Sequence, residues 1–247
     1  MYFRLTFEPQ KGCVDLPLSY HHILQGFVYH LLDENPEYAS FLHDTGFQAE
    51  ARIFKMFVCG LLNGRYRVSD GQIRFLDTVS FEIRSPMAEF NGLLSKRFSE
   101  ENVYQLGNNT IILSGLEIGD KEYLGNRIYV SMRSPLVLKK YMDVDGKSNT
   151  RYLTPQDDDF NELLNDNYRR KYLAAFGQEP TGKIWIDPNS WHRQKKYVTR
   201  FPGKTGEDIL ITGWLGDFEL KADPHALSFL YDVGLGSNNS AGFGMFD

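Results

Sequence analysis

Cysteine is scarce in this sequence, which contains only Cys13 and Cys59 among its 247 residues. Neither cysteine belongs to a Cys-x-x-Cys pair or to a cysteine–histidine spacing, so neither a zinc site nor a disulfide framework is indicated. Long apolar runs are missing as well, and the charged start of the chain does not resemble a signal peptide. We therefore expect a cytoplasmic protein with no membrane partner.

An excess of positive charge is also missing. The 27 Lys and Arg residues are outnumbered by 32 Asp and Glu residues, for a net charge of −5. The whole molecule is therefore not attracted to nucleic acid, and any nucleic-acid site has to be a local basic patch. The acidic residues form no cluster with the spacing of metal ligands, so we predict no metal and no other cofactor.

The first half of the chain predicts the order strand, helix, strand, strand, helix, strand. Apolar residues at helical spacing predict helices over residues 20–32 and 87–98. Strands are predicted over residues 2–7, 72–83 and 110–116, and residues 51–62 are predicted to form a strand or a strand pair. This order of elements is the ferredoxin-like arrangement.

The second half predicts the same order again. Its elements are strands over residues 127–132 and 136–139, a helix over 157–176, strands over 183–186, 195–200 and 209–220, a helix over 224–231 and a closing strand over 243–246. An Arg-Ser-Pro triplet follows a predicted strand in each half, at residues 84–86 and 133–135, which supports a duplication. We therefore predict an α+β protein with two tandem ferredoxin-like (RRM-like, βαββαβ) domains, residues 1–122 and 123–247.

Residues 234–244 are unusually rich in glycine, with two Gly-x-Gly pairs formed by Gly234, Gly236, Gly242 and Gly244. No Lys-Ser or Lys-Thr follows, so the stretch is not a P-loop, and Asn239 replaces the third glycine of a dinucleotide-binding fingerprint. Glycine disfavours order unless the backbone needs positive φ or a close approach. We interpret the stretch as a backbone platform facing phosphate groups, with a flexible loop as the alternative.

Two residues near the first helices are candidates for acid–base chemistry. Tyr29 points away from the apolar stripe of the helix over residues 20–32, on the same face as His22. His43 lies in the last turn of a short helix that begins at Asn35-Pro36, where the helix dipole should raise the imidazole pKa. A histidine so placed can act as a general acid near neutral pH. A surface tyrosine and an ordinary helix-end charge are the alternatives, and His22 is a reserve candidate.

One region is locally basic. Between residues 183 and 204 only Asp187 opposes six cations, which are Lys183, Arg193, Lys195, Lys196, Arg200 and Lys204. Four rings are interleaved with them, those of Trp191, His192, Tyr197 and Phe201. Cations for phosphates and rings for base stacking suit single-stranded or looped RNA. A solvated hairpin without a partner is the alternative.

With the glycine stretch and the duplicated element order, the chain resembles the RAMP superfamily of CRISPR-associated proteins. Within it, the chain is similar to the endoribonucleases that cut CRISPR precursor RNA at each repeat. The segments Leu24-Gln-Gly-Phe-Val-Tyr29 and Tyr38-Ala-x-x-Leu42-His43 resemble the first helices of that family. The resemblance runs almost from end to end and is most specific at the two termini.

The resemblance implies an active site made of Tyr29, His43 and a basic residue. That residue, usually lysine, falls on Arg52, and Lys55 is a possible substitute. The family's glycine-rich loop falls on the four glycines of residues 234–244.

The implied reaction is metal-free attack of the RNA 2′-hydroxyl on the scissile phosphate, with repeat-containing CRISPR precursor RNA as the partner. Other subunits of a CRISPR effector complex are further possible partners. Two other functions stay open. One is a non-catalytic RAMP subunit that binds RNA, against which the presence of Tyr29 and His43 argues. The other is a generic module with two RRM-like folds, which the missing RNP pattern weakens.

Overall fold

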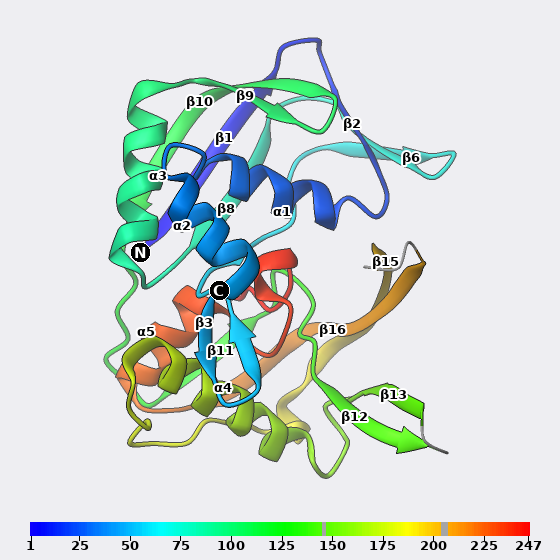
Figure 1. Ribbon diagram of the computed structural model, residues 1–247. Helices are drawn as coiled ribbons and strands as arrows, with labels where there is room; N and C mark the ends of the chain where they lie inside the picture. The colour runs from blue at the N-terminus through cyan, green and yellow to red at the C-terminus, as the bar shows by residue number, and fades with distance from the viewer. Residues whose placement is uncertain (145–146, 204–206) are drawn as a thin grey trace.

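The computed structural model describes residues 1–144, 147–203 and 207–247. A five-stranded antiparallel sheet with the order β5–β8–β1–β10–β9 is the centre of the first half (Figure 1). Its strands are β1 (Tyr2–Pro9), β5 (Val58–Cys59), β8 (Val79–Arg84), β9 (Val103–Leu106) and β10 (Asn109–Gly119). Helices α1 (His21–His30) and α3 (Ala88–Glu100) pack on one face of this sheet.

The pattern of apolar residues explains this packing. Phe3, Leu5 and Phe7 alternate along β1 and are all buried against the two helices. On α1 the buried residues Leu24 and Phe27 follow the helical spacing of the sequence. The predicted strand over residues 2–7 and the helices over 20–32 and 87–98 are therefore confirmed, with ends that differ by a few residues.

Two predicted strands of the first half are interrupted by turns. Residues 51–62 contain two strands, as the strand-pair alternative predicted, namely β4 (Arg52–Phe54), which forms a hairpin with β3 (Phe47–Ala49), and β5, which pairs with β8. The backbone bends at Met56, whose φ is 53°. Residues 72–83 contain β7 (Gln72–Phe75) and β8, which belong to different sheets. Strand β7 pairs with β2 (Val14–Pro17) and β6 (Tyr66–Ser69) in a small third sheet.

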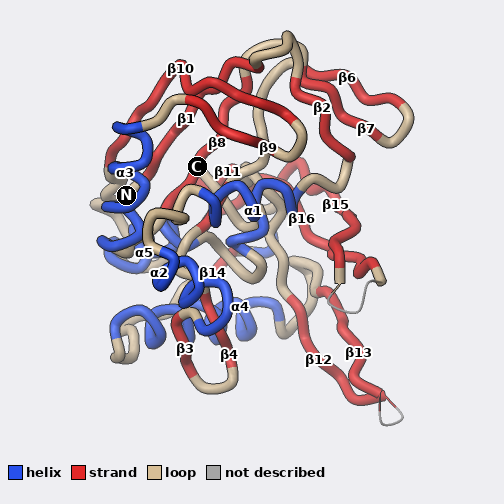
Figure 2. The backbone as a smooth tube through the Cα atoms, turned by 45° about the horizontal axis from the view of Figure 1, so that its top comes forward, coloured by secondary structure: helices blue, strands red, loops and turns tan. Residues whose placement is uncertain are grey.

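The second half contains a sheet of order β11–β16–β14, on which β15 also pairs with β16. Its strands are β11 (Arg127–Ser131), β14 (Trp185–Ile186), β15 (His192–Pro202) and β16 (Asp208–Lys221), and its helices are α4 (Phe160–Phe176) and α5 (Pro224–Val233). A hairpin that the sequence analysis missed, β12 (Lys139–Val144) and β13 (Lys147–Tyr152), stands apart from this sheet. It extends toward the same side of the molecule as the β15–β16 hairpin (Figure 2).

Two further strand predictions in this half need correction. The predicted strand over residues 136–139 is reduced to one isolated bridge, between Leu136 and Trp214. The closing strand over residues 243–246 is reduced to one bridge between Met132 and Phe246. Gly244, with φ at 78°, interrupts the extended backbone there.

Buried Arg84 joins the two halves at the end of the chain. Its guanidinium donates to the carboxylate of Glu82 at 2.6 Å and to the backbone oxygen of Phe246 at 2.6 Å. It also lies 3.6 Å from the ring centre of Tyr231. A buried charge is tolerated when it is paired and hydrogen-bonded in this way, so the halves are held in one arrangement. Among the described residues, no helix is long and apolar enough to cross a membrane.

Candidate active site and RNA interface

His43 lies in an unusual helical turn. Helix α2 (Pro36–Ser40) begins at Asn35, whose side chain accepts from the Tyr38 amide at 3.1 Å. The helix then widens into a π-helical turn, Phe41–Thr45, which ends where the Gly46 amide donates to the Phe41 carbonyl at 2.6 Å. Single π-helical turns are frequent at functional sites. The turn leaves the His43 side chain 69% exposed.

Tyr29, near the end of α1, faces this histidine. The two ring centres are 5.4 Å apart and the rings meet edge to face, at 69°. The tyrosine ring is half-buried and also contacts Phe57, so it is not the plain surface residue that was the alternative interpretation. Burial raises the pKa of Tyr29 to about 12, so its hydroxyl stays protonated at neutral pH and can donate a hydrogen bond.

The two basic candidates occupy different positions. The Lys55 ammonium donates to the backbone carbonyl of His43 at 2.6 Å, which places it beside the histidine. The Arg52 guanidinium lies 5.0 Å from the ring centre of Tyr141 on β12, across the junction between the halves. The structure therefore brings Tyr29, His43 and Lys55 together and places Arg52 in the neighbouring cavity.

His21, at the start of α1, is fully buried. It donates from Nδ1 to the Ala241 carbonyl at 2.8 Å and accepts from the Tyr197 hydroxyl at 3.0 Å, while stacking on Phe243 at 4.4 Å. Burial lowers the pKa of His21 to about 4, so the ring is neutral and fixes α1 to the glycine-rich loop. The reserve candidate His22 is exposed on α1.

The four glycines of residues 234–244 are buried, and each has positive φ. A Cβ atom would lie 2.4 Å from the Val137 oxygen at Gly236 and 2.0 Å from the Leu235 oxygen at Gly244. These glycines therefore serve the packing of the loop, and a contact of their backbone with phosphate groups stays a prediction. Gly236 and the half-buried residues Ser237, Asn238 and Ser240 line a cavity.

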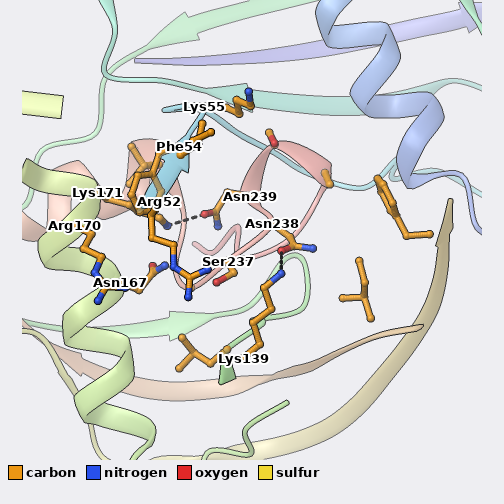
Figure 3. Close-up of a pocket in the computed structure, with 18 of the residues that line it drawn as sticks. Arg52, Phe54, Lys55, Lys139, Asn167, Arg170, Lys171, Ser237, Asn238 and Asn239 are labelled. Atoms are coloured by element: carbon orange, nitrogen blue, oxygen red, sulfur yellow. Dashed lines mark hydrogen bonds between the residues drawn. The ribbon is translucent and has the colours of Figure 1, made fainter. Parts of the chain in front are cut away.

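Lys171, a buried lysine of α4, forms hydrogen bonds to this loop. The Lys171 ammonium donates to the Gly234 carbonyl at 2.8 Å and to the Asn239 side-chain oxygen at 2.6 Å (Figure 3). The Asn239 amide in turn donates to the carbonyls of Leu235 and Phe243, both at 3.0 Å. The network bridges the two ends of the loop and explains why Asn239 stands in a glycine-rich stretch.

We expect the contribution of Lys171 to stability to depend on pH, because burial lowers its pKa from 10.5 to about 7. Between those values the unfolded chain holds more protons than the folded chain, so the free energy of unfolding rises with pH. In Lys171→Met this rise should be lost. The free energy of unfolding of the wild type, minus that of Lys171→Met, should therefore increase between about pH 7 and 10. The increase should be a few kcal/mol at most.

Urea unfolding of both proteins across this pH range measures the effect. Lys11→Met, which changes an exposed lysine, is the matched control and should follow the wild type at every pH. Parallel curves for wild type and Lys171→Met would contradict the burial of a titrating ammonium.

A cavity of about 690 Å³ lies between β4, α4, β12 and the glycine-rich loop. Its described lining contains one carboxylate, that of Asp166, and six cations, which are Arg52, Lys55, Lys139, Lys140, Arg170 and Lys171. Figure 3 shows Arg52 and Lys139 reaching from opposite sides toward Ser237 and Asn238. The cavity can therefore bind an anionic chain such as an RNA backbone.

The predicted basic patch is divided in the structure. Lys195, Lys196 and Arg200 are exposed on β15, whereas the Arg193 guanidinium is paired with the carboxylate of Asp217. Lys183 lies just before β14, which pairs with the end of β16 at Lys221. Arg200 pairs with Leu210, near the other end of β16, so Lys183 lies far from Arg200. Lys204 lies outside the described residues.

The rings of this region are also less available than predicted. Trp191 is buried and stacks on Phe218, with ring centres 4.3 Å apart. Tyr197 is half-buried and held by His21, and Phe201 packs against a small apolar cluster. Base stacking by Trp191 or Tyr197 would require rearrangement, whereas His192 is exposed at the start of β15. This surface therefore offers RNA its cations and one exposed ring.

Comparison with known proteins adds to this geometry. Residues 119–247, just over half of the chain, match the family model described as CRISPR associated protein Cas6, C-terminal. The chain belongs to the Cas6 family. Two proteins of Methanocaldococcus jannaschii named CRISPR-associated endoribonuclease Cas6 1 and Cas6 2 are similar to it. The first is 25% identical, over 93% of this chain and 86% of its own length. The second is 27% identical, over 92% and 90%.

Solved Cas6 structures share the fold over both halves of this Cas6-family chain. One described as CRISPR associated protein Cas6 has a TM-score of 0.77 at 23% identity and covers 100% of this chain and 98% of its own. Another, of a Cas6-related gene from Pyrococcus furiosus, has a TM-score of 0.82 at 19% identity, with coverage of 100% and 97%. The mixed α/β fold is therefore shared along the whole chain.

Proposed function

We propose that this Cas6-family protein is an endoribonuclease that cuts CRISPR precursor RNA within its repeats to release guide RNAs. The observation that carries the proposal is the cluster of Tyr29, His43 and Lys55 at the edge of the basic cavity. The relatives named CRISPR-associated endoribonucleases support it, at 25–27% identity over most of this chain.

The reaction needs little more than proton transfer and charge stabilisation, because RNA supplies its own nucleophile, the 2′-hydroxyl. The exposed imidazole of His43 moves a proton to or from a ribose oxygen, and the protonated Tyr29 hydroxyl orients the substrate or shares that role. The ammonium of Lys55 or the guanidinium of Arg52 neutralises charge that develops on the phosphate. The products are a 2′,3′-cyclic phosphate (or 3′-phosphate) and a 5′-hydroxyl.

Two basic surfaces hold the RNA in this proposal. The first is the cavity, where Arg52, Lys139 and Lys140 face solvent from both halves of the chain. The second is the exposed face of β15, with Lys195, Lys196 and Arg200. Phosphate contacts of this kind position an RNA without reading its sequence.

We further propose that the halves are tandem ferredoxin-like domains, residues 1–122 and 123–247. The first sheet supports this, because β1, β5, β8 and β10 pair in the order β5–β8–β1–β10, as interlocked βαβ units do. The second sheet supports it because its order β11–β16–β14 corresponds to β1–β8–β5 of the first sheet. The bridge from Met132 to Phe246 places the end of the chain next to β11, where β10 lies next to β1 in the first sheet. The family match, which begins at residue 119, is close to the proposed boundary.

The test is incubation of the purified protein with a CRISPR repeat RNA in excess EDTA. We expect cleavage at one position in each repeat, because no step of the proposed chemistry uses a metal ion, and the product ends identify the reaction. Binding without cleavage, with and without added Mg²⁺, would favour the alternative, a non-catalytic RNA-binding subunit. Cleavage only after Mg²⁺ is added would contradict the metal-free mechanism.

A further inference from the structure

Asp44 follows His43 in the π-helical turn, and both oxygens of its carboxylate have partners. Oδ1 accepts from Nδ1 of His43 at 2.7 Å, and Oδ2 accepts from the Ser40 hydroxyl at 3.2 Å. Ser40 is the last residue of α2, so the preceding turn holds the carboxylate that contacts the imidazole. The reaction proposed above assigns no role to Asp44.

This contact determines which imidazole nitrogen carries the proton. A carboxylate is only an acceptor, so Nδ1 of His43 must be the donor, and Nε2 is the nitrogen that faces away from Asp44. The hydrogen bond from His43 is also the main reason why the pKa of Asp44 is below its ordinary value. The side chain of Asp44 is therefore a carboxylate at neutral pH, which is the form that can only accept the hydrogen bond from Nδ1.

The other groups around the ring do not duplicate this role. Lys55 holds the backbone of the turn, through the His43 carbonyl, and its charge also acts on Asp44. Tyr29 meets the ring edge to face and is uncharged at neutral pH. Asp44 contacts the imidazole with a full negative charge.

We propose that Asp44 is a positioning residue for RNA cleavage. It keeps His43 in the Nδ1–H tautomer, so that Nε2 is the nitrogen that exchanges a proton with the RNA. The kinetic part of this inference rests on the proposed function, whereas the tautomer of His43 is a property of the free protein.

The free protein is tested first, by NMR of its histidine ring nitrogens at high pH, with the His43 signals identified by their absence in His43→Ala. In Asp44→Ala, which removes the acceptor, the spectrum should show a larger share of the Nε2–H tautomer at His43 than in the wild type. Asp44→Asn, whose side-chain oxygen can still accept from Nδ1, should keep the wild-type tautomer. An unchanged tautomer in Asp44→Ala would overturn the proposal.

The chain offers a matched control in the exposed pair of His30 and Asp33, in which Nδ1 lies 3.2 Å from the carboxylate. Asp33→Ala should raise the share of the Nε2–H tautomer at His30 and leave the tautomer of His43 unchanged. This control separates the effect of Asp44 from a general loss of negative charge.

Cleavage is tested second. Asp44→Ala should slow single-turnover cleavage at neutral pH by roughly tenfold, less than removal of an acid–base group, and leave repeat affinity unchanged. Asp44→Asn, whose side-chain oxygen can still accept from Nδ1, should recover most of the lost rate. Equal losses in the two variants would contradict a role of Asp44 in setting the tautomer. If the wild type cuts no repeat RNA, the proposed function fails while the tautomer measured by NMR still decides this inference.

Discussion

Replacing His43 by alanine should slow cleavage of a repeat RNA by roughly 10²–10⁴-fold while leaving repeat affinity nearly unchanged. The rate should fall because His43 is the titratable ring in the Tyr29 cluster, exposed on a turn that holds it in place. The affinity should survive because phosphate contacts in the cavity and on β15 supply most of the binding. Single-turnover cleavage and filter binding with the same RNA measure the two effects.

Three companion variants sharpen this result. Tyr29→Phe should slow cleavage less than His43→Ala, because the half-buried ring remains to position the substrate. His30→Ala, which removes another exposed histidine next to Tyr29, should cut at the wild-type rate. If His43→Ala cuts normally and His22→Ala does not, the histidine assignment is wrong and moves to His22.

Removing three cations of the cavity, in Arg52→Ala, Lys139→Ala and Lys140→Ala combined, should weaken repeat binding by at least about tenfold at physiological salt. Each lost phosphate contact on single-stranded RNA should also reduce the slope of log affinity against log salt by about 0.7. The corresponding triple variant of β15, at Lys195, Lys196 and Arg200, should weaken binding and flatten the slope in the same manner.

The control for both is a triple alanine variant at Lys11, Arg67 and Lys121. These three cations are exposed and lie outside both the lining of the cavity and β15. Affinity and slope should match the wild type. If all three triple variants bind alike, the binding surface lies elsewhere on the molecule.

Much of the fold can be predicted from the sequence where a pattern is local. Strand β1 and helices α1 and α3 follow from alternation and helical spacing, since their buried residues are consecutive members of one stripe. Strands β7 and β8 could not be told apart, because the alternation of buried residues resumes after a three-residue turn that leads to another sheet. Tertiary pairing decides such cases, and periodicity does not contain it.

The candidate site divides in the same way. Tyr29 and His43 can be singled out because each has a recognisable place on a local helix. Tyr29 lies away from the apolar stripe of α1, and His43 lies in the last turn of the next helical segment. The cavity cannot, since Arg52, Lys139 and Arg170 come from segments that only the fold brings together.

Lys171 and His21 did carry a signal that the sequence analysis did not use. Each polar residue lies three residues from a buried apolar one on the same helix, Tyr168 for Lys171 and Leu24 for His21. A polar residue within an apolar stripe predicts a buried group that needs a partner.

The measurement that tests the central claim most directly replaces the ribose at the cut site of a repeat RNA by 2′-deoxyribose and follows cleavage by the wild-type protein. If the 2′-hydroxyl is the nucleophile, the substituted RNA should bind with the affinity of the all-ribose RNA and remain uncut, while the all-ribose RNA is cut under the same conditions. Cleavage of the deoxy-substituted RNA at the same phosphate would contradict the mechanism and the roles of His43 and Tyr29 in it.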